Sequence, residues 1–397
     1  MTLKNKGPRF RAVQKQIVLS LSLLISTFSY KYSHAAPSSF IEARDKLTQA
    51  SKDYPESFKV FSWSLENVSK ESSDDVDSFL SYLLKNESLL PDIIILEDFK
   101  QNLLPEQTIQ RLKATYSYSE FFPYQKKQID EVNLLSKLKT EIRKNGYSEE
   151  YLEAELNKFT DSMYQLKKSG AYSEIAVFCK IPSFKLSRQA QLDWNNPVLK
   201  NPEAIHKYKS SYQTHYEMMD PWTRPYLKFN FPWKGKDINF IPLSLIMPWS
   251  TQKTDASLFS ALFKKMSITK EMTLNEQSPH FSQVFSLLKE LDHDDIIKTD
   301  KSTLMIGNFN VFLKQNNTWP IRPESLAWVY LESFNFENLF PLDSKLVTYP
   351  MSESKWTKDL GKSQVDHAFT KGELIKRAAE VLPVSGSSHY PIYVIVE

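Results

Sequence analysis

Alternating and continuous apolar stretches near the start of the chain predict strands and a helix. Residues 58–63 alternate apolar and polar side chains and are rich in β-forming types, and 91–96 contains a short apolar run typical of a strand buried on both faces. Between them, 74–85 carries apolar residues at helical spacing. A strand, a helix and a second strand indicate mixed layers of α and β structure.

Further strands are predicted along the rest of the chain, with one more helix among them. The strands span 174–179, 226–231, 238–246, 304–306 and 390–396, and the helix spans 281–291. Many strands and few helices favour two sheets packed face to face, flanked by helices, over a doubly wound parallel sheet.

One segment has the pattern of an inserted helical hairpin. Helical spacing runs over 127–145 and again over 148–168, where Ser148 is suited to cap the second helix, and Gly146 and Gly170 are suited to end the two helices. We expect residues 127–168 to form a peripheral insertion. Its charged outer face is either solvated surface or a partner-binding or lid element.

A second segment, Leu-Asp-His-Asp-Asp at 291–295, mixes residue types that can bind metal ions. It follows a predicted helix and precedes a predicted strand. We therefore expect a solvated turn there rather than a metal site.

The first 36 residues have the composition of a secretory signal peptide. A basic start leads into a 12-residue apolar run from Ile17 to Phe28, followed by small residues at Ser33 and Ala35. The run is shorter than the roughly 20 residues of a membrane-spanning helix. We expect cleavage after Ala35 or Ala36 and export of the mature chain to the periplasm or the medium; an uncleaved membrane anchor is the alternative.

Charge and composition exclude several classes of protein. The formal charge is 50 − 47 = +3, but the first 36 residues hold six basic residues and no acid, which leaves 44 − 47 = −3 for the rest. Nucleic-acid binders usually carry a basic domain or face, so sequence-specific nucleic-acid binding is not expected. Only 8 glycines are present and no GxxxxGK or GxGxxG occurs, which argues against a nucleotide-binding loop. The single cysteine, Cys179, allows no internal disulfide.

Four short blocks at predicted strand ends carry the chemistry, and a fifth precedes the last of them. In order along the chain, they are Ser-Trp-Ser-Leu-Glu-Asn at 62–67, Asp-Ile-Ile-Ile-Leu-Glu-Asp-Phe at 92–99, Gly-Asn-Phe-Asn at 307–310, Val-Asp-His-Ala-Phe at 365–369 and Ser-Ser-His-Tyr-Pro-Ile at 387–392. Each resembles one catalytic block of the endonuclease/exonuclease/phosphatase superfamily. The resemblance covers about residues 57–397 apart from the hairpin, and implies an α+β fold, the deoxyribonuclease I-like four-layer α/β/β/α sandwich.

The resemblance implies a site for one or two divalent cations, Mg²⁺ or Mn²⁺. The acid of the first block is matched by Glu66 and the metal-binding Glu of the second by Asp98, one methylene shorter, with Glu97 where Gln is usual. Strand alternation predicts that Ser64 and Glu66 share a face, and that Glu97 points away from Asp98 unless the register slips.

Several matched positions depart from the family's pattern. The family has Gly-Asp-x-Asn in the third block, whose Asp orients or deprotonates the attacking water; here Asn308 replaces that Asp and Asn310 is retained. An amide is a very poor base near neutral pH. Three further positions carry serine instead of the family's residue: Ser64 replaces an Asn, Ser244 a His and Ser388 an Asp.

One pair of the family's catalytic residues is intact. Asp366 matches the Asp that hydrogen-bonds the last-block His, here His389, and such a bond fixes the tautomer and favours the charged imidazole. An imidazolium beside a phosphate would stabilise transition-state charge. The pair could also serve only to hold two strands together.

Two hypotheses about function follow. The first is an exported protein with this fold and an impaired phosphoesterase site, a pseudoenzyme that acts as a binding or interaction module for a phosphoester ligand or a protein partner. The second is a divergent metal-dependent phosphodiesterase or phosphatase that uses Glu66, Asp98 and His389 on a small phosphoester or a lipid headgroup. Whether Glu66 and Asp98 converge beside His389 discriminates between them.

Overall fold

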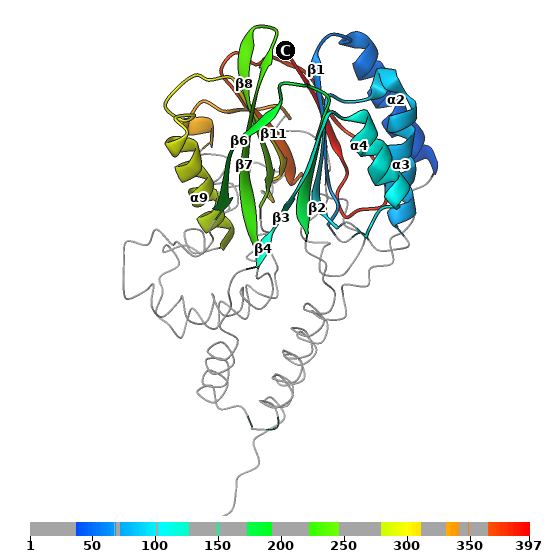
Figure 1. Ribbon diagram of the computed structural model, residues 1–397, viewed down its shortest axis with the longest axis horizontal. Helices are drawn as coiled ribbons and strands as arrows, with labels where there is room; N and C mark the ends of the chain where they lie inside the picture. Colours follow the sequence, from blue (N-terminus) through cyan, green and yellow to red (C-terminus); the bar gives the residue numbers. More distant parts are fainter. Residues whose placement is uncertain are drawn as a thin grey trace, which may run out of the picture.

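Two β-sheets packed face to face form the centre of the protein, and helices cover the outer face of each sheet (Figure 1). The computed structural model describes residues 37–66, 68, 72–100, 102–126, 148, 150, 173–192, 222–245, 279–310, 331–340, 348 and 364–397. The predicted signal peptide and most of the predicted hairpin at 127–168 lie outside the described residues.

The first sheet has six strands around a central parallel pair, β1 and β2; its other pairs are antiparallel. The last strand of the chain, β13, pairs with β1. The spatial order is β12 (Lys376–Val381), β13 (Ile392–Val396), β1 (Phe58–Ser64), β2 (Ile93–Phe99), β5 (Glu174–Cys179) and β3 (Tyr118–Pro123).

The second sheet has seven strands and also contains one parallel pair, β8 and β9. Its order is β10 (Glu337–Asn338), β11 (Asp366–Lys371), β9 (Thr303–Asn308), β8 (Lys236–Ser244), β7 (Trp222–Trp233) and β4 (Gln125–Lys126). The seventh strand, β6 (Lys185–Leu192), pairs with β7.

Three hydrophobic clusters hold the four layers together. One fills the space between the sheets, where Phe184 stacks on Phe229 with ring centroids 4.5 Å apart. The second packs helices α2 (Pro37–Asp53), α3 (Ser73–Lys85) and α4 (Glu106–Thr115) on the first sheet, and the third packs α9 (Pro279–His293) on the second. A 3₁₀ turn, η1 (Glu87–Leu89), follows α3.

Strand alternation distributes β1 between two of these clusters. Val60 lies in the cluster between the sheets, whereas Phe61 and Trp63 lie under the helices. The same alternation carries Ser62 and Ser64 onto the face between the sheets. These polar residues are buried near the end of β1, at 2% and 1% exposure, where an apolar core would otherwise continue.

The predicted α+β four-layer sandwich is confirmed, and each predicted strand overlaps a strand of the structure. Helix α2 was not predicted; it lies before residue 57, the predicted start of the domain, and buries Ala43, Leu47 and Ala50 under the first sheet. Among the described residues, no helix is both long and apolar enough to cross a membrane.

Candidate active site

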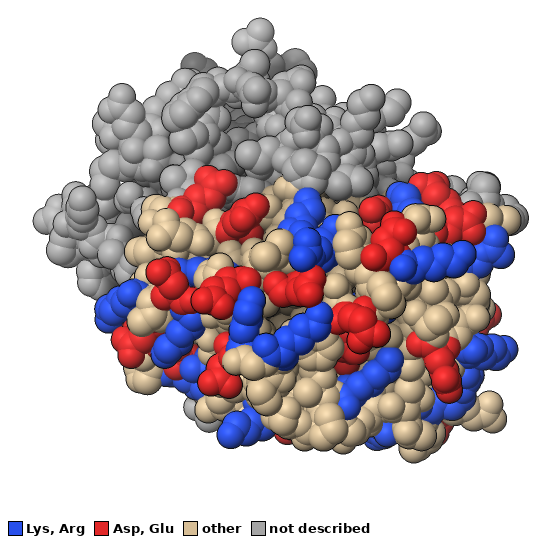
Figure 2. Space-filling view, turned by 90° about the horizontal axis from the view of Figure 1, so that it is seen from above, with Lys and Arg blue, Asp and Glu red and all other residues tan. Residues whose placement is uncertain are grey.

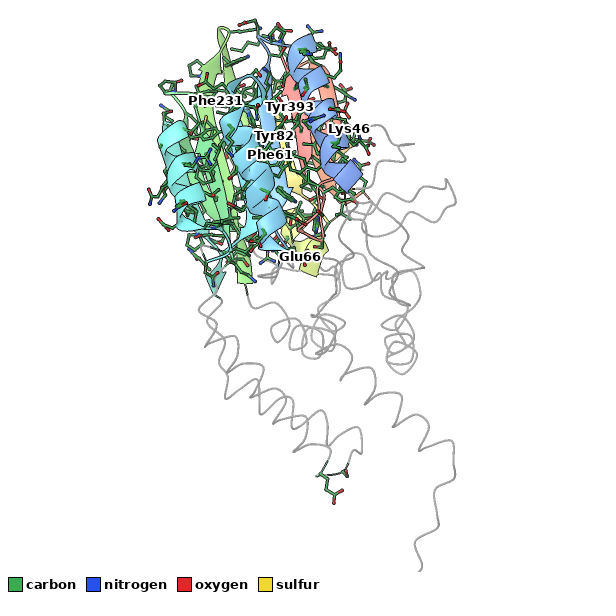
Figure 3. All side chains as sticks on the ribbon, turned by 90° about the vertical axis from the view of Figure 1, so that its right-hand side faces the viewer. Lys46, Phe61, Glu66, Tyr82, Phe231 and Tyr393 are labelled. Carbon is green, nitrogen blue, oxygen red and sulfur yellow. The ribbon has the colours of Figure 1, made fainter. Side chains whose placement is uncertain are left out.

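Polar side chains gather where strands of both sheets end. Ser64 is in register with Glu97 across β1 and β2, and Asn308 of β9 is in register with Ser244 of β8 and Asp366 of β11. Figure 3 shows Glu66 at the lower edge of the described sandwich, just beyond β1. The two parallel pairs therefore bring distant parts of the sequence to one edge.

His389 lies at the centre of this edge, between two carboxylates. Its Nδ1 is 2.9 Å from Asp366 Oδ2, and its Nε2 is 3.1 Å from Glu66 Oε2. The imidazole is fully buried. Burial alone would lower the pKa of His389, but Asp366 and Glu66 together raise it to about 10. The ring is therefore an imidazolium near neutral pH, with both N–H groups donated to carboxylates.

Neighbouring polar groups fix the backbone on both sides of His389. The Trp63 indole N–H donates to the His389 carbonyl at 2.9 Å, and the Ser387 hydroxyl donates to the Ser64 carbonyl at 2.6 Å. Thr348 Oγ1 accepts the backbone N–H of Asp366 at 3.1 Å. These contacts connect the ends of β1, β11 and the segment before β13.

Glu66 reaches His389 from a turn rather than from a strand. Strand β1 ends at Ser64, so the expected strand alternation between Ser64 and Glu66 was wrong. The Glu66 carbonyl instead accepts the Ser387 and Ser388 hydroxyls, at 3.1 and 2.9 Å. Ser388 therefore points to the Glu66 backbone.

A bulge in β2 gives the side chains of Glu97 and Asp98 directions that regular strand alternation does not predict. The pairing of β2 with β5 shifts between Leu96 and Phe99, and Asp98 adopts a positive φ of 51°. Both acids consequently contact serines on one face of β1: Ser62 donates to Glu97 Oε1 at 2.6 Å, and Ser64 donates to Asp98 Oδ2 at 3.2 Å. The expectation that Glu97 points away from Asp98 was wrong because it assumed regular pleating.

Glu97 is a fully buried acid. Burial raises its pKa well above the usual range, and the nearby charges of Asp366 and Asp98 act in the same direction against the Ser62 hydrogen bond. Gly307 of β9 makes room for it: a Cβ there would lie 2.7 Å from Glu97 Oε1 and 2.0 Å from the Leu243 carbonyl oxygen. The surroundings of Glu97 therefore favour its neutral form over its charged form.

Asp98 faces an arginine that the sequence did not single out as a site residue. Arg224 Nη2 lies 4.0 Å from Asp98 Oδ1, and the guanidinium carbon lies 4.3 Å from the centroid of the Tyr124 ring. Asp98 Oδ2 also accepts the Ser244 hydroxyl at 3.3 Å. Arg224 lies just before the predicted strand at 226–231, and nothing in its local sequence indicates a partner 126 residues earlier.

Asn308, the last residue of β9, and Asn310, just beyond it, are held by one another and by neighbouring segments. Asn308 Oδ1 accepts the backbone N–H of Asn310 at 3.0 Å, and Asn308 Nδ2 lies 3.5 Å from Ser64 Oγ. Asn310 donates its amide to the Leu245 carbonyl at 2.6 Å. The amide of Asn308 thus lies beside Ser64, whose hydroxyl donates to Asp98.

These residues fit a resident divalent cation poorly. The Glu66 carboxylate accepts from His389, Asp98 accepts from two serines, and the Arg224 guanidinium already lies near Asp98. Within the described ranges, no group of three or more His, Cys, Asp or Glu side chains is placed to hold a metal ion. Two buried oxygens, Glu97 Oε2 and Asn310 Oδ1, have no hydrogen-bond partner among the described residues and are the oxygens best suited to a cation.

A second buried charge cluster lies between α9 and the second sheet. Arg188 of β6 pairs with Glu290 and Asp294, Lys228 Nζ lies 3.2 Å from Asp294 Oδ1, and the Tyr226 hydroxyl donates to Asp294 Oδ2 at 2.8 Å. The Asp294 side chain is 8% exposed. The turn at 291–295 was predicted to be solvated; this is wrong for Asp294, which fastens the turn to the sheet.

Opposite charges are interspersed over the described part of the surface seen in Figure 2. Lys and Arg side chains there alternate with Asp and Glu side chains instead of forming one basic area.

The layers, the strand order and the polar residues at the strand ends define a deoxyribonuclease I-like sandwich, the fold of the endonuclease/exonuclease/phosphatase superfamily. No family model matches the sequence. No curated protein sequence matches it either.

Solved structures with a similar arrangement come from that superfamily. An endonuclease/exonuclease/phosphatase family protein from Leptotrichia buccalis is 12% identical with a TM-score of 0.45, over 86% of this chain and 99% of that one. The human Nocturnin catalytic domain is 13% identical with a TM-score of 0.45, over 86% and 94%. A mannosyl-6-phosphatase from Bacteroides thetaiotaomicron is 11% identical with a TM-score of 0.45, over 86% and 100%. At these values no residue role, metal or substrate is transferred to this chain.

Proposed function

We propose that the protein is exported and that it binds a phosphoester ligand at the strand-end site, the group of polar residues around His389. We propose further that this site hydrolyses the ligand poorly or not at all. The observation that carries the proposal is the geometry of His389, whose two ring nitrogens each lie on a carboxylate, an arrangement that favours the imidazolium. A group that already holds both protons cannot accept one from water. It can, however, stabilise an anion.

Asn308 supports poor hydrolysis independently. An amide carries no charge and is a very poor base near neutral pH, and Asn308 Oδ1 is already occupied by the Asn310 backbone N–H. Loss of an essential base commonly lowers the rate by a factor on the order of 100 to 10,000. Neither His389 nor Asn308 supplies that base.

Positive groups near the site favour a negatively charged ligand. The charges of His389, Arg224 and Lys100 all lower the pKa of the Glu66 carboxylate against the opposing effect of burial. Glu66 itself is 33% exposed, so solvent reaches this position. A phosphoester presents oxyanion acceptors to such donors. A protein partner presenting a carboxylate would use the same donors.

A second candidate function is favoured by the unpartnered oxygens of Glu97 and Asn310. If a cation displaced the Glu97 proton, these oxygens and Asp98 would supply hard ligands of the kind Mg²⁺ binds. The protein would then be a divergent metal-dependent phosphoesterase acting on a small phosphoester or a lipid headgroup. Asn308 and the partners of Glu66 weigh against it.

A metal titration with an activity assay separates the two functions. Calorimetry with Mg²⁺ and Mn²⁺ should show weak binding by the native chain, and bis(p-nitrophenyl) phosphate should be hydrolysed at the background rate. Asn308→Asp should tighten Mn²⁺ binding, because it adds a carboxylate beside Asp98. Tight Mg²⁺ binding and turnover by the native chain, both abolished by Asp98→Ala, would establish the phosphoesterase instead.

Export is tested on the protein made by its own host. Mass spectrometry of the soluble mature form should give an N-terminus at Ala36 or Pro37. A main soluble form that retains Met1 would contradict export by cleavage of a signal peptide.

A further inference from the structure

The two ring nitrogens of His389 face very different surroundings. Nδ1 is held by Asp366, whose side chain is 4% exposed, whereas Nε2 is held by Glu66, whose side chain is 33% exposed. The inner partner is therefore part of the core, and the outer partner lies at the solvent side. An incoming ligand can reach only the outer nitrogen.

The backbone of Glu66 is fixed although its side chain lies at the surface. Its carbonyl oxygen accepts the Ser388 hydroxyl and, at 3.3 Å, the Ser388 backbone N–H, and it shares the Ser387 hydroxyl proton with the Ser64 carbonyl. The carboxylate can consequently leave His389 by side-chain rotation alone. No rearrangement of the strands is required.

The Glu66 carboxylate has the chemistry of an oxyanion ligand. It accepts the Nε2–H of a buried cation at 3.1 Å and lies within the field of Arg224 and Lys100. We propose that Glu66 is a built-in competitor, which closes the ligand site by occupying the outer nitrogen of His389 until a phosphate-type oxyanion displaces it. This inference rests on the proposed function, since it assumes that the ligand binds at the same site.

A phosphate that displaces Glu66 still pairs with His389. Its other oxygens can make further contacts that the one carboxylate of Glu66 does not make. One phosphate oxygen takes the Nε2–H, and the remaining negative charge interacts with Arg224 and Lys100, the charges that act on the Glu66 carboxylate. The Glu66 carboxylate, one-third exposed while it is paired, is then solvated by water. A monoester dianion competes better than a diester monoanion because it carries more charge.

Phosphate titrations of charge-matched variants test this competition. Calorimetry with inorganic phosphate, methyl phosphate and dimethyl phosphate is run on the native chain, Glu66→Gln and Glu66→Ala. Removing the competing charge should tighten inorganic phosphate binding about tenfold. Glu373→Gln is the control: it removes the same charge from a side chain that is 74% exposed, in the turn between β11 and β12 at the far end of β11 from Asp366.

A second measurement uses the native chain and does not depend on how the variants fold. In nitrogen-15 spectra, inorganic phosphate should shift the Nε2–H signal of His389 while the Nδ1–H signal, held by Asp366, stays in place. Unchanged phosphate affinity in both Glu66 variants, or an unmoved Nε2–H signal at saturating phosphate, would overturn the competitor role. Turnover of a phosphodiester by the native chain would overturn the proposed function alone, because competition by Glu66 could still be measured.

Discussion

The protein buries two clusters of charge, and they are built differently. In the cluster between α9 and the second sheet, Arg188 and Lys228 face Glu290 and Asp294, so that cations and acids match. At the strand ends, four acids lie near three cations. The acids are Glu66, Glu97, Asp98 and Asp366, and the cations are His389, Arg224 and Lys100.

The difference is the one expected between a structural cluster and a ligand-binding one. Matched charges with a tyrosine hydroxyl donor leave the α9 cluster compensated, and it fastens a turn to a sheet. The strand-end cluster buries Glu97 with a raised pKa, and Glu97 Oε2 and Asn310 Oδ1 have no hydrogen-bond partner in the described part of the chain. Shifted pKa values and unpaired buried oxygens are typical of ligand-binding sites, because a bound ligand can supply the missing partners.

The largest expected effect comes from breaking the matched cluster. Asp294→Ala should lower the free energy of unfolding by about 3 kcal/mol, because it removes the acceptor of Lys228 and of the Tyr226 hydroxyl and leaves Arg188 with Glu290 alone. Chemical denaturation measures the change. Asp292→Ala is the control: its side chain is 49% exposed and pairs with Lys298, so its effect should stay small. Equal losses in both variants would remove the distinction between the clusters.

Replacing Glu97 by a neutral residue should raise the free energy of unfolding by an amount that depends on pH. Glu97 has a raised pKa in the folded state, so the folded chain holds a proton that the unfolded chain releases above its ordinary pKa of about 4.3. Its contribution to stability is therefore lost as pH rises above that value. Glu97→Gln should match the native chain near pH 4 and become progressively more stable than it toward pH 8. If the free energies of unfolding of the native chain and of Glu97→Gln differed by the same amount at every pH in this range, the raised pKa of Glu97 would be contradicted.

The smallest effect on stability is expected at Asp98. Asp98→Asn keeps an oxygen for the hydroxyls of Ser64 and Ser244 and removes one charge from an acid-rich cluster. The free energy of unfolding should change by less than about 1 kcal/mol. A loss comparable to that of Asp294→Ala would mean that the strand-end cluster is as structural as the other.

Much of the fold could be predicted from the sequence because buried strands carry continuous or alternating apolar residues, as β2 and β5 do. Strand β6 was missed because Lys185–Leu192 is mostly polar and only partly buried. Helix α2 was missed although Ala43, Leu47 and Ala50 share one face, since its apolar stripe is narrow.

The composition of the site was predictable, but its geometry was not. Ordered blocks at strand ends indicated that Glu66, Asp98, Asp366 and His389 would meet at one edge. The β2 bulge depends on pairing with β5 across about 80 residues, and the Arg224–Tyr124 contact spans 100. Local patterns contain no signal for either.

The protonation state of His389 tests the central claim most directly. Because Asp366 and Glu66 raise the pKa of His389 to about 10, the stability that the ring contributes is present below pH 6.5 and is lost as pH rises through 10. Nitrogen-15 spectra at pH 8 should therefore show both ring nitrogens of His389 protonated. A neutral ring at pH 8, with one nitrogen unprotonated, would restore a general base to the site and contradict the account.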